Sequence, residues 1–167
     1  MRQKPVWRAL RGCFEGFDDK VRSAQVDETL AQLHIAAERF AVAEQAILRA
    51  VERLEKGGEE ALLSEALTTQ GIILSRLGRR SEAMSVLERS NRVAESCGDR
   101  EGAGRALLIM IEEMCDELDD RGRLEIGNRL DILLAHSQKR LILERLRKCH
   151  ERIDKASARH ETRPDEP

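Results

Sequence analysis

The feature that most limits how this chain can fold is a weak internal repeat with a period of 40 residues. When the sequence is shifted against itself by this distance, small and apolar residues fall on small and apolar residues. The aligned pairs are Arg39 with Arg79, Ala43 with Ala83, Ile47 with Leu87, Gly58 with Gly98, Ala66 with Ala106, and Leu67 with Leu107. Such a period is typical of proteins in which each unit buries its apolar face against the next.

Proline positions and composition indicate that the repeated unit is helical. The three prolines are Pro5, Pro164 and Pro167, so residues 6–163 contain none. A proline inside a helix destabilises that helix by about 3 kcal/mol. Because residues 6–163 contain no proline, none of them is excluded from a helix on this ground. Aromatic residues make up only 2% of the chain and tyrosine is absent, although sheets are enriched in aromatic side chains. We therefore predict an all-α protein.

Apolar residues at helical spacing divide each repeat into two helices. In the clearest unit, one stripe runs from Leu63 through Leu67 and Gly71 to Leu74, and Gly78 follows as a helix stop. A second stripe comprises Ala83, Val86, Leu87, Ser90 and Ala94. Extending this pattern predicts helices at 5–15, 24–38, 41–56, 60–77, 81–97, 101–119, 122–135 and 138–153.

The segment Ser64–Ala103 resembles a tetratricopeptide (TPR) repeat of the longer, bacterial type. With Ser64 as position one, it has the large and small residues of that pattern at Leu67, Gly71, Leu74, Gly78, Ala83 and Leu87. The preceding unit departs from the pattern at His34 and Glu38, where an apolar residue and glycine are usual. The resemblance implies an α-solenoid of antiparallel helix pairs, with about 2.5–3 repeats and a capping helix at each end.

Composition divides the chain into one repeat domain with two flanking segments. Residues 1–20 are basic and aromatic, residues 21–153 form the repeat domain, and residues 154–167 are polar and expected to be disordered. The first segment, predicted to be a capping helix, has an apolar stripe of Trp7, Leu10, Phe14 and Phe17. We expect this stripe either to pack on the first repeat or to be an exposed anchor for a partner or for self-association as a homo-oligomer.

No motif in the sequence predicts a catalytic, cofactor or metal site. The chain has no Gly-Lys pair for a phosphate loop, and none of its four histidines follows a glutamate by three residues, as helical di-iron sites require. The four cysteines never form a CxxC pair, and we expect them to be buried small apolar residues. The acidic run from Glu112 to Asp120 lacks the spacing of a calcium loop, so it predicts a solvated face or a partner surface.

Charge and hydropathy narrow the classes of partner. A net charge of −2 and a pI near 6.1 give no general attraction to nucleic acid. No apolar run approaches the roughly 20 residues that span a bilayer, and the N-terminus lacks the apolar stretch of a signal peptide. We therefore expect a cytoplasmic protein that contacts neither nucleic acid nor membrane directly.

The TPR resemblance implies a concave groove lined by the first helix of each unit. The positions that face such a groove are Gln25, Glu28, Gln32, Glu65, Thr68, Ile72, Ser75, Arg76, Arg105, Leu108, Glu112 and Asp116. TPR domains that clamp a C-terminal carboxylate place lysine and asparagine where this chain has Glu28, Gln32, Thr68 and Ile72, so no such clamp is expected.

The expected function is that of a non-catalytic interaction module, an adaptor or scaffold that holds a peptide or helix of a partner in this groove. The alternative is a regulatory or sensor domain that acts on a transcription or signalling protein and responds to a peptide. A neighbouring coding region for a DNA-binding or kinase partner would favour that alternative.

Overall fold

The computed structural model describes residues 20–57 and 59–161, and within them the chain is all-α. There are seven α-helices, one short 3-10 helix and no strand in these two ranges. The elements are α2 (Lys20–Ala36), α3 (Phe40–Gly57), α4 (Glu60–Arg76), α5 (Arg80–Ser96), α6 (Arg100–Met114), η1 (Cys115–Glu117), α7 (Asp120–Leu134) and α8 (Arg140–Glu161). The predicted helix at 5–15, the apolar stripe with Trp7, Leu10, Phe14 and Phe17, and Gly58 lie outside the described residues.

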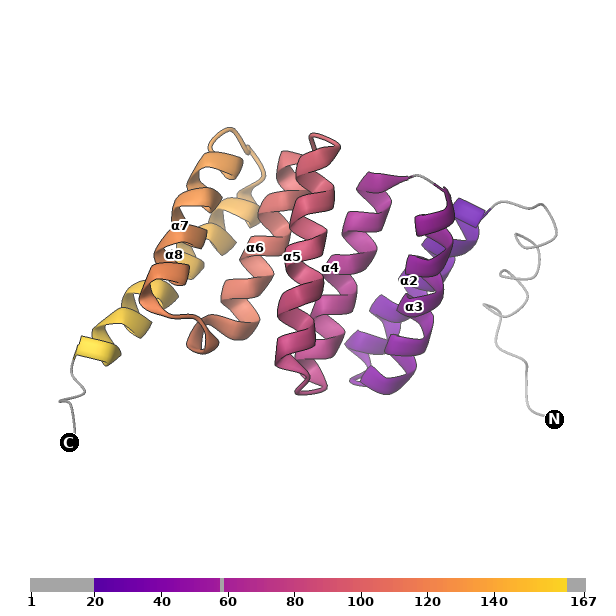
Figure 1. Cartoon of the computed structure of the whole chain (residues 1–167), viewed down its shortest axis with the longest axis horizontal. Coiled ribbons are helices and arrows are strands. Elements are labelled where there is room, and N and C mark those ends of the chain that lie inside the picture. Colours follow the sequence, from indigo (N-terminus) through magenta and orange to yellow (C-terminus); the bar gives the residue numbers. More distant parts are fainter. Residues whose placement is uncertain (1–19, 58, 162–167) are drawn as a thin grey trace.

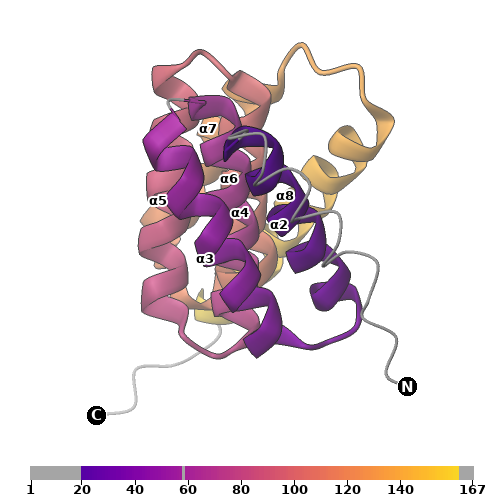
Figure 2. The same ribbon diagram turned by 90° about the vertical axis from the view of Figure 1, so that its right-hand side faces the viewer.

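Successive helices pack side by side as antiparallel pairs in a single row, with α2 and α3 at one end and α8 at the other (Figure 1). Viewed along the row, α3 and α5 lie on one side, and α2 and α8 lie on the other (Figure 2). We call the side formed by α2, α4, α6 and α8 the inner face, and the side formed by α3, α5 and α7 the outer face. The helices of the inner face also contact one another, α2 with α4, α4 with α6, and α6 with α8.

Helix starts repeat with the 40-residue period that the sequence predicts. The inner-face helices α4, α6 and α8 begin at residues 60, 100 and 140, and the outer-face helices α3, α5 and α7 begin at residues 40, 80 and 120. A constant offset between equivalent helices means that helix pairs follow one another along the chain at one spacing, as in repeat proteins. The structure is therefore one of stacked helical repeats.

The apolar interior forms where the predicted stripes face each other. Leu63, Leu67 and Leu74 of α4 are buried, as are Ala83 and Leu87 of α5. A Cβ added to Gly71 would lie 2.5 Å from Cγ of Leu87, which is closer than real side chains approach. The two helices therefore require a small residue at the predicted crossing point.

Ser90 of α5 is fully buried, and its hydroxyl forms hydrogen bonds inside the α4–α5 contact. Its Oγ donates to the carbonyl oxygen of Ser64 at 2.7 Å and lies 2.8 Å from Oγ1 of Thr68. A buried hydroxyl with a hydrogen-bond partner has little desolvation cost. A polar side chain in this contact is therefore compatible with tight packing.

The interior is divided into two clusters along the row. One contains buried residues of α2, α3 and α4, and the other contains buried residues of α5 to α8 together with Leu74 of α4. Helix α4 contributes to both, through Leu67 and Ile73 to the first and through Leu74 to the second.

Two predicted boundaries are wrong for physical reasons. Helix α8 continues to Glu161 rather than ending at residue 153, because Ala156 is buried and Ser157 donates to Asp120 of α7 at 3.1 Å. Residues 154–161 of the predicted disordered tail are therefore helical. The predicted helix 101–119 instead ends at Met114, and buried Arg123 donates to the Cys115 carbonyl at 3.1 Å beyond that end.

The turn after α2 contains a glutamate in a backbone conformation that favours glycine. Glu38 has a φ of 55°, and Gly78, 40 residues later, has a φ of 78° in the equivalent turn after α4. The turns share their hydrogen bonds, since Arg39 N donates to the His34 carbonyl at 2.9 Å and Arg79 N donates to that of Leu74 at 3.0 Å.

We expect Glu38→Gly to raise the free energy of unfolding by about 1 kcal/mol, because an L-residue pays about that much in the left-handed region. Gly78→Ala is the matched control and should lower it by a similar amount, since an added Cβ there meets nothing within 4 Å and only the backbone term changes. Urea denaturation followed by circular dichroism measures both. Equal and opposite shifts support the assignment of strain to Glu38, whereas a loss of stability in both variants would contradict it.

The cysteines are only partly as expected. Cys115 and Cys149 are buried, and burial raises the pKa of the Cys149 thiol to about 12, so it is unreactive at neutral pH. Cys97, which was expected to be buried, is exposed because it lies at the C-terminal cap of α5. Cys13 lies outside the described residues.

None of the described helices is both long and apolar enough to cross a bilayer.

Candidate functional site

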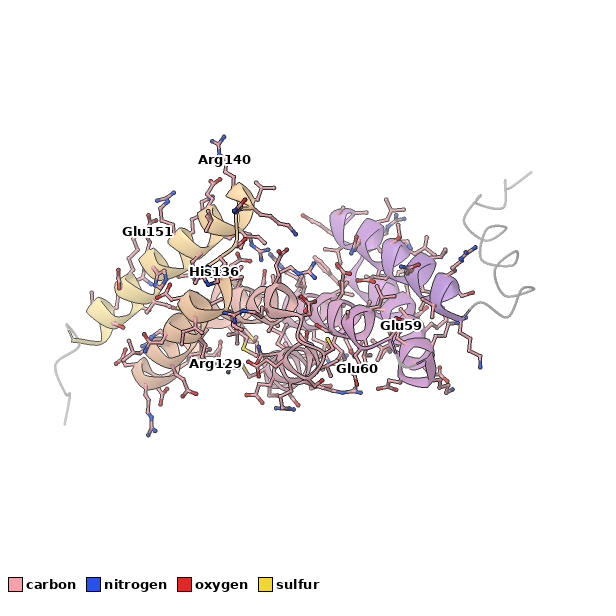
Figure 3. The ribbon with its side chains drawn as sticks, turned by 90° about the horizontal axis from the view of Figure 1, so that it is seen from above. Glu59, Glu60, Arg129, His136, Arg140 and Glu151 are labelled. Carbon is pink, nitrogen blue, oxygen red and sulfur yellow. The ribbon has the colours of Figure 1, made fainter. Side chains whose placement is uncertain are left out.

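The inner face brings side chains of four separate helices onto one side of the molecule. Seen from above, the α8 residues Arg140 and Glu151 project on one side of the row, and Arg129 of α7 lies on the opposite side (Figure 3). Polar side chains of each inner-face helix, from α2 to α8, contact polar side chains of the next inner-face helix. These contacts define the candidate site.

The first contacts join α2, α4 and α6. Thr69 of α4 donates its hydroxyl hydrogen to a carboxylate oxygen of Glu28 of α2 at 3.2 Å. One turn earlier on α4, Glu65 accepts from the guanidinium of Arg105 of α6 at 3.0 Å. Glu28 is only 6% exposed, while Glu65 and Arg105 are both about one-third exposed. We call these four residues the Glu28 cluster.

Glu28 has an unusual acidity that follows from its position. Burial is the main cause and the nearby Glu65 carboxylate a smaller one of a rise in the pKa of its carboxyl, from the ordinary 4.5 to about 7. The hydrogen bond from Thr69 and the charge of Arg105 oppose this rise and leave it incomplete. The carboxyl therefore changes its charge near neutral pH, in contrast to an ordinary glutamate.

A second group of contacts lies nearer the C-terminal end of α4. Arg76 donates to Glu113 of α6 at 2.8 Å, and Ser75 donates to the other oxygen of the same carboxylate at 3.4 Å. Arg80, at the start of α5, pairs with Glu117 of η1 at 2.9 Å. The Arg76 side chain is more than half exposed, so it remains available to a ligand on this face.

Helix α8 closes the row of contacts at the C-terminal end. The Arg145 guanidinium binds both oxygens of the Glu112 carboxylate, at 2.7 and 2.8 Å. Arg152 of the same helix donates to the Glu112 main-chain carbonyl at 2.7 Å. The bidentate geometry fixes the position of the α8 side chains relative to α6.

The structure distributes the predicted groove residues unevenly. Gln25, Gln32, Arg76 and Asp116 are exposed, whereas Glu65, Ile72, Arg105 and Glu112 are half-buried on the inner face. Glu28 and Ser75 are buried, but each has a polar contact with the next inner-face helix.

Two predicted residues do not lie on an open surface. Leu108 has no exposed area, because α8 covers it and Sγ of Cys149 lies 3.9 Å from its carbonyl oxygen. Thr68 directs its hydroxyl to Ser90 of α5 and not toward the inner face. Neither side chain is placed to contact a ligand directly in this structure.

Sequence reasoning missed four residues that complete the inner face, namely Thr69, Glu113, Arg145 and Arg152. A signal for two of them exists, since Arg145 and Arg152 lie 40 residues after the predicted Arg105 and Glu112. Extending the repeat by one helix would have found them. Thr69 and Glu113 each follow a predicted residue by one position. Which of the two neighbouring residues faces the groove depends on the rotation of the helix about its axis.

A pocket of about 410 Å³ lies on the outer side of the molecule, where α5, α6 and α7 meet. Apolar side chains such as Met84, Leu107 and Ile126 line it together with charged residues. Arg129 of α7 also lines this pocket and binds Glu95 of α5 at 2.7 Å. No residue of the predicted groove contributes to this pocket.

Comparisons with known proteins add no further assignment. No protein-family model matches the chain, and no curated protein matches it. Among residues 20–57 and 59–161, no group of three or more histidine, cysteine, aspartate or glutamate side chains is arranged to hold a metal ion. The architecture and contacts of the described residues are therefore the basis for a functional proposal.

Proposed function

We propose that this chain is a non-catalytic protein-interaction module of the TPR type, which binds a peptide or helix of a partner along its inner face. The 40-residue offset between equivalent helices supports the relation to long TPR repeats. So do the glycine in the turn after α4 and the small residues at the α4–α5 crossing.

The observation that carries this proposal is the continuous run of side chains from α2, α4, α6 and α8 on one face. A segment lying across these helices would meet exposed Gln25 and Gln32 first, then Ile72 and Arg76 of α4, and then the charged residues of α6 and α8. Such a surface offers an apolar anchor with charges on both sides. Extended peptides and amphipathic helices are recognised by surfaces of this kind.

The test replaces an apolar and a basic side chain at the centre of this surface with acidic ones. We expect Ile72→Asp combined with Arg76→Glu to abolish capture of the natural partner, because the double change replaces the apolar anchor and reverses an exposed charge. Tagged wild-type and variant proteins are used for affinity purification from the native lysate, followed by mass spectrometry. Circular dichroism of each variant reports whether it is still helical.

A matched control makes the same kinds of change on the outer side. Leu124 and Arg121 of α7 are both exposed, and Leu124→Asp combined with Arg121→Glu should leave partner capture intact. A partner that is lost only from the helical inner-face variant supports the proposed function. Recovery of the same proteins by wild type and both variants would contradict it.

A further inference from the structure

Glu28 is a buried carboxyl that lacks a cationic partner among the described residues. It is 6% exposed and accepts one hydrogen bond, from the neutral hydroxyl of Thr69. The nearest guanidinium in its cluster, that of Arg105, is bound to Glu65 instead. Buried carboxylates are almost always paired with a cation, because removing an isolated charge from water is costly.

The preceding residue on the same helix, Asp27, is a buried carboxylate with a structural role. Asp27 is fully buried, and its two oxygens bind Arg49 and Arg53 of α3. These two guanidinium groups therefore serve Asp27 and not Glu28. Adjacent residues on α2 thus differ, since the Asp27 carboxylate forms ion pairs with two arginines, whereas the Glu28 carboxyl forms no ion pair with any described residue.

We propose that the Glu28 cluster is a subsite for a lysine or arginine side chain of the bound partner segment, which places its cation between the carboxylates of Glu28 and Glu65. This inference rests on the proposed function, because it names the chemistry of one contact on the inner face. The cluster has two carboxyl groups and one guanidinium, so one entering cation balances its charge. The exposed amides of Gln25 and Gln32 lie on the same helix, three residues before and four after Glu28.

Binding at this subsite is coupled to a proton. The groups that face Glu28 are Glu65 and Thr69 of α4 and Arg105 of α6, and together with burial they hold the pKa of Glu28 near 7. A cation favours the ionised carboxyl, so the proton must leave when the partner's cation binds below this pKa. For a pKa of about 7, this requirement makes the affinity about tenfold higher at pH 8 than at pH 6.

The experiment uses a random library of 12-residue peptides displayed on phage and selected against the full chain. Selected sequences without histidine, aspartate or glutamate are synthesised, once with their basic residue and once with norleucine in its place. Fluorescence anisotropy gives the affinity of each peptide for wild type and for Glu28→Gln at pH 6 and pH 8. Glutamine keeps the size of the side chain and can still accept the hydrogen bond from Thr69.

We expect the norleucine peptide to bind wild type about tenfold or more weakly at pH 8, since a charge-assisted contact is lost. In Glu28→Gln, the same replacement should change the affinity by about twofold or less, and the difference between pH 6 and pH 8 should disappear. Exposed Glu52 of α3 supplies the control, because Glu52→Gln removes a carboxylate elsewhere and should retain both the preference for the basic residue and the pH dependence.

The outcomes separate this inference from the proposed function. Peptides that bind wild type and fail to bind Ile72→Asp/Arg76→Glu, but show the same norleucine effect in wild type and Glu28→Gln, would overturn the cation subsite and leave the inner face as the binding site. If no selected peptide distinguishes the inner-face variant from wild type, both proposals are wrong.

Discussion

Replacing Asp27 with alanine is expected to lower the free energy of unfolding by about 2–4 kcal/mol. Asp27 is fully buried between α2 and α3, and one of its oxygens accepts from Nε and Nη2 of Arg49 at 3.2 and 3.0 Å. Its other oxygen binds Arg53. Alanine removes the shared carboxylate and leaves both guanidinium groups beside a buried gap.

The size of this effect depends on how far the two arginines can turn toward water. Their side chains are 38% and 24% exposed, which places the expected loss below that of a fully buried ion pair. Urea denaturation at neutral pH measures the change. The control is Asp131→Ala, because Asp131 of α7 is exposed and binds His150 at the surface, and it should cost less than about 0.5 kcal/mol. Similar losses in both variants would contradict a structural role for the Asp27 contacts.

Glu28→Gln is expected to stabilise the unliganded protein at pH 8 by about 2–3 kcal/mol. This change removes a carboxylate that is ionised at pH 8 although it is buried and lies near Glu65. The amide that replaces it carries no charge and keeps an acceptor for Thr69. Few substitutions of a buried polar residue raise stability. An increase would therefore indicate that the ionised Glu28 carboxylate destabilises the folded state.

The pH dependence follows from the direction of the pKa shift. Burial raises the pKa of Glu28 from 4.5 in the unfolded chain to about 7 in the folded one, so the folded state binds a proton more tightly. The stability linked to that proton is fully present below pH 4.5 and is lost as the pH rises toward and through 7. Wild type and Glu28→Gln should therefore be nearly equal in stability at pH 4.5, with the advantage of the variant growing up to about pH 8.

Denaturation curves at intervals between pH 4.5 and 8 measure this difference. Glu52→Gln is the control, because its hydrogen bond with Lys56 lowers the pKa of the Glu52 carboxyl and moves its titration below this range. The Glu52 variant should follow the wild-type profile from pH 5 to 8. A constant difference between wild type and Glu28→Gln at all pH values would show that Glu28 is not held near neutral acidity by its surroundings.

The fold could be predicted from the sequence because its determinants are local and periodic. The apolar stripes with Leu67 and Leu87 and the stop at Gly78 act through helix geometry, and the small residue at Gly71 lies where two helices that are adjacent in the sequence cross. The 40-residue period then relates one helix pair to the next without knowledge of any contact. Departures arose at helix ends, where Arg123 and Ser157 act through contacts with other elements.

The candidate site could be predicted only in outline. Successive residues on a helix differ in direction by about 100°, so a register that points Thr68 at the inner face misses Thr69, which is the residue that binds Glu28. The rotation of α4 is set by its packing on α2, α5 and α6 together. The burial of Leu108 likewise depends on where α8 comes to rest.

For a related reason, the sequence alone could not show that Glu28 forms no ion pair with the described residues. Asp27 and Glu28 are neighbours of the same charge, and their patterns in the sequence give no indication that only one of them has arginine partners. Direction on the helix decides this, since Asp27 faces α3 and Glu28 faces α4.

The division of the interior into two clusters has a consequence for how the molecule responds to a partner. Stabilisation passes from the N-terminal helices to the C-terminal ones through α4 and the adjoining side chains of α5, so thermal opening at one end can leave the other end folded. A segment bound across α2, α4 and α6 would bridge the two clusters from outside. The bound partner would then couple the unfolding of the two clusters more tightly than α4 and α5 do in the free chain.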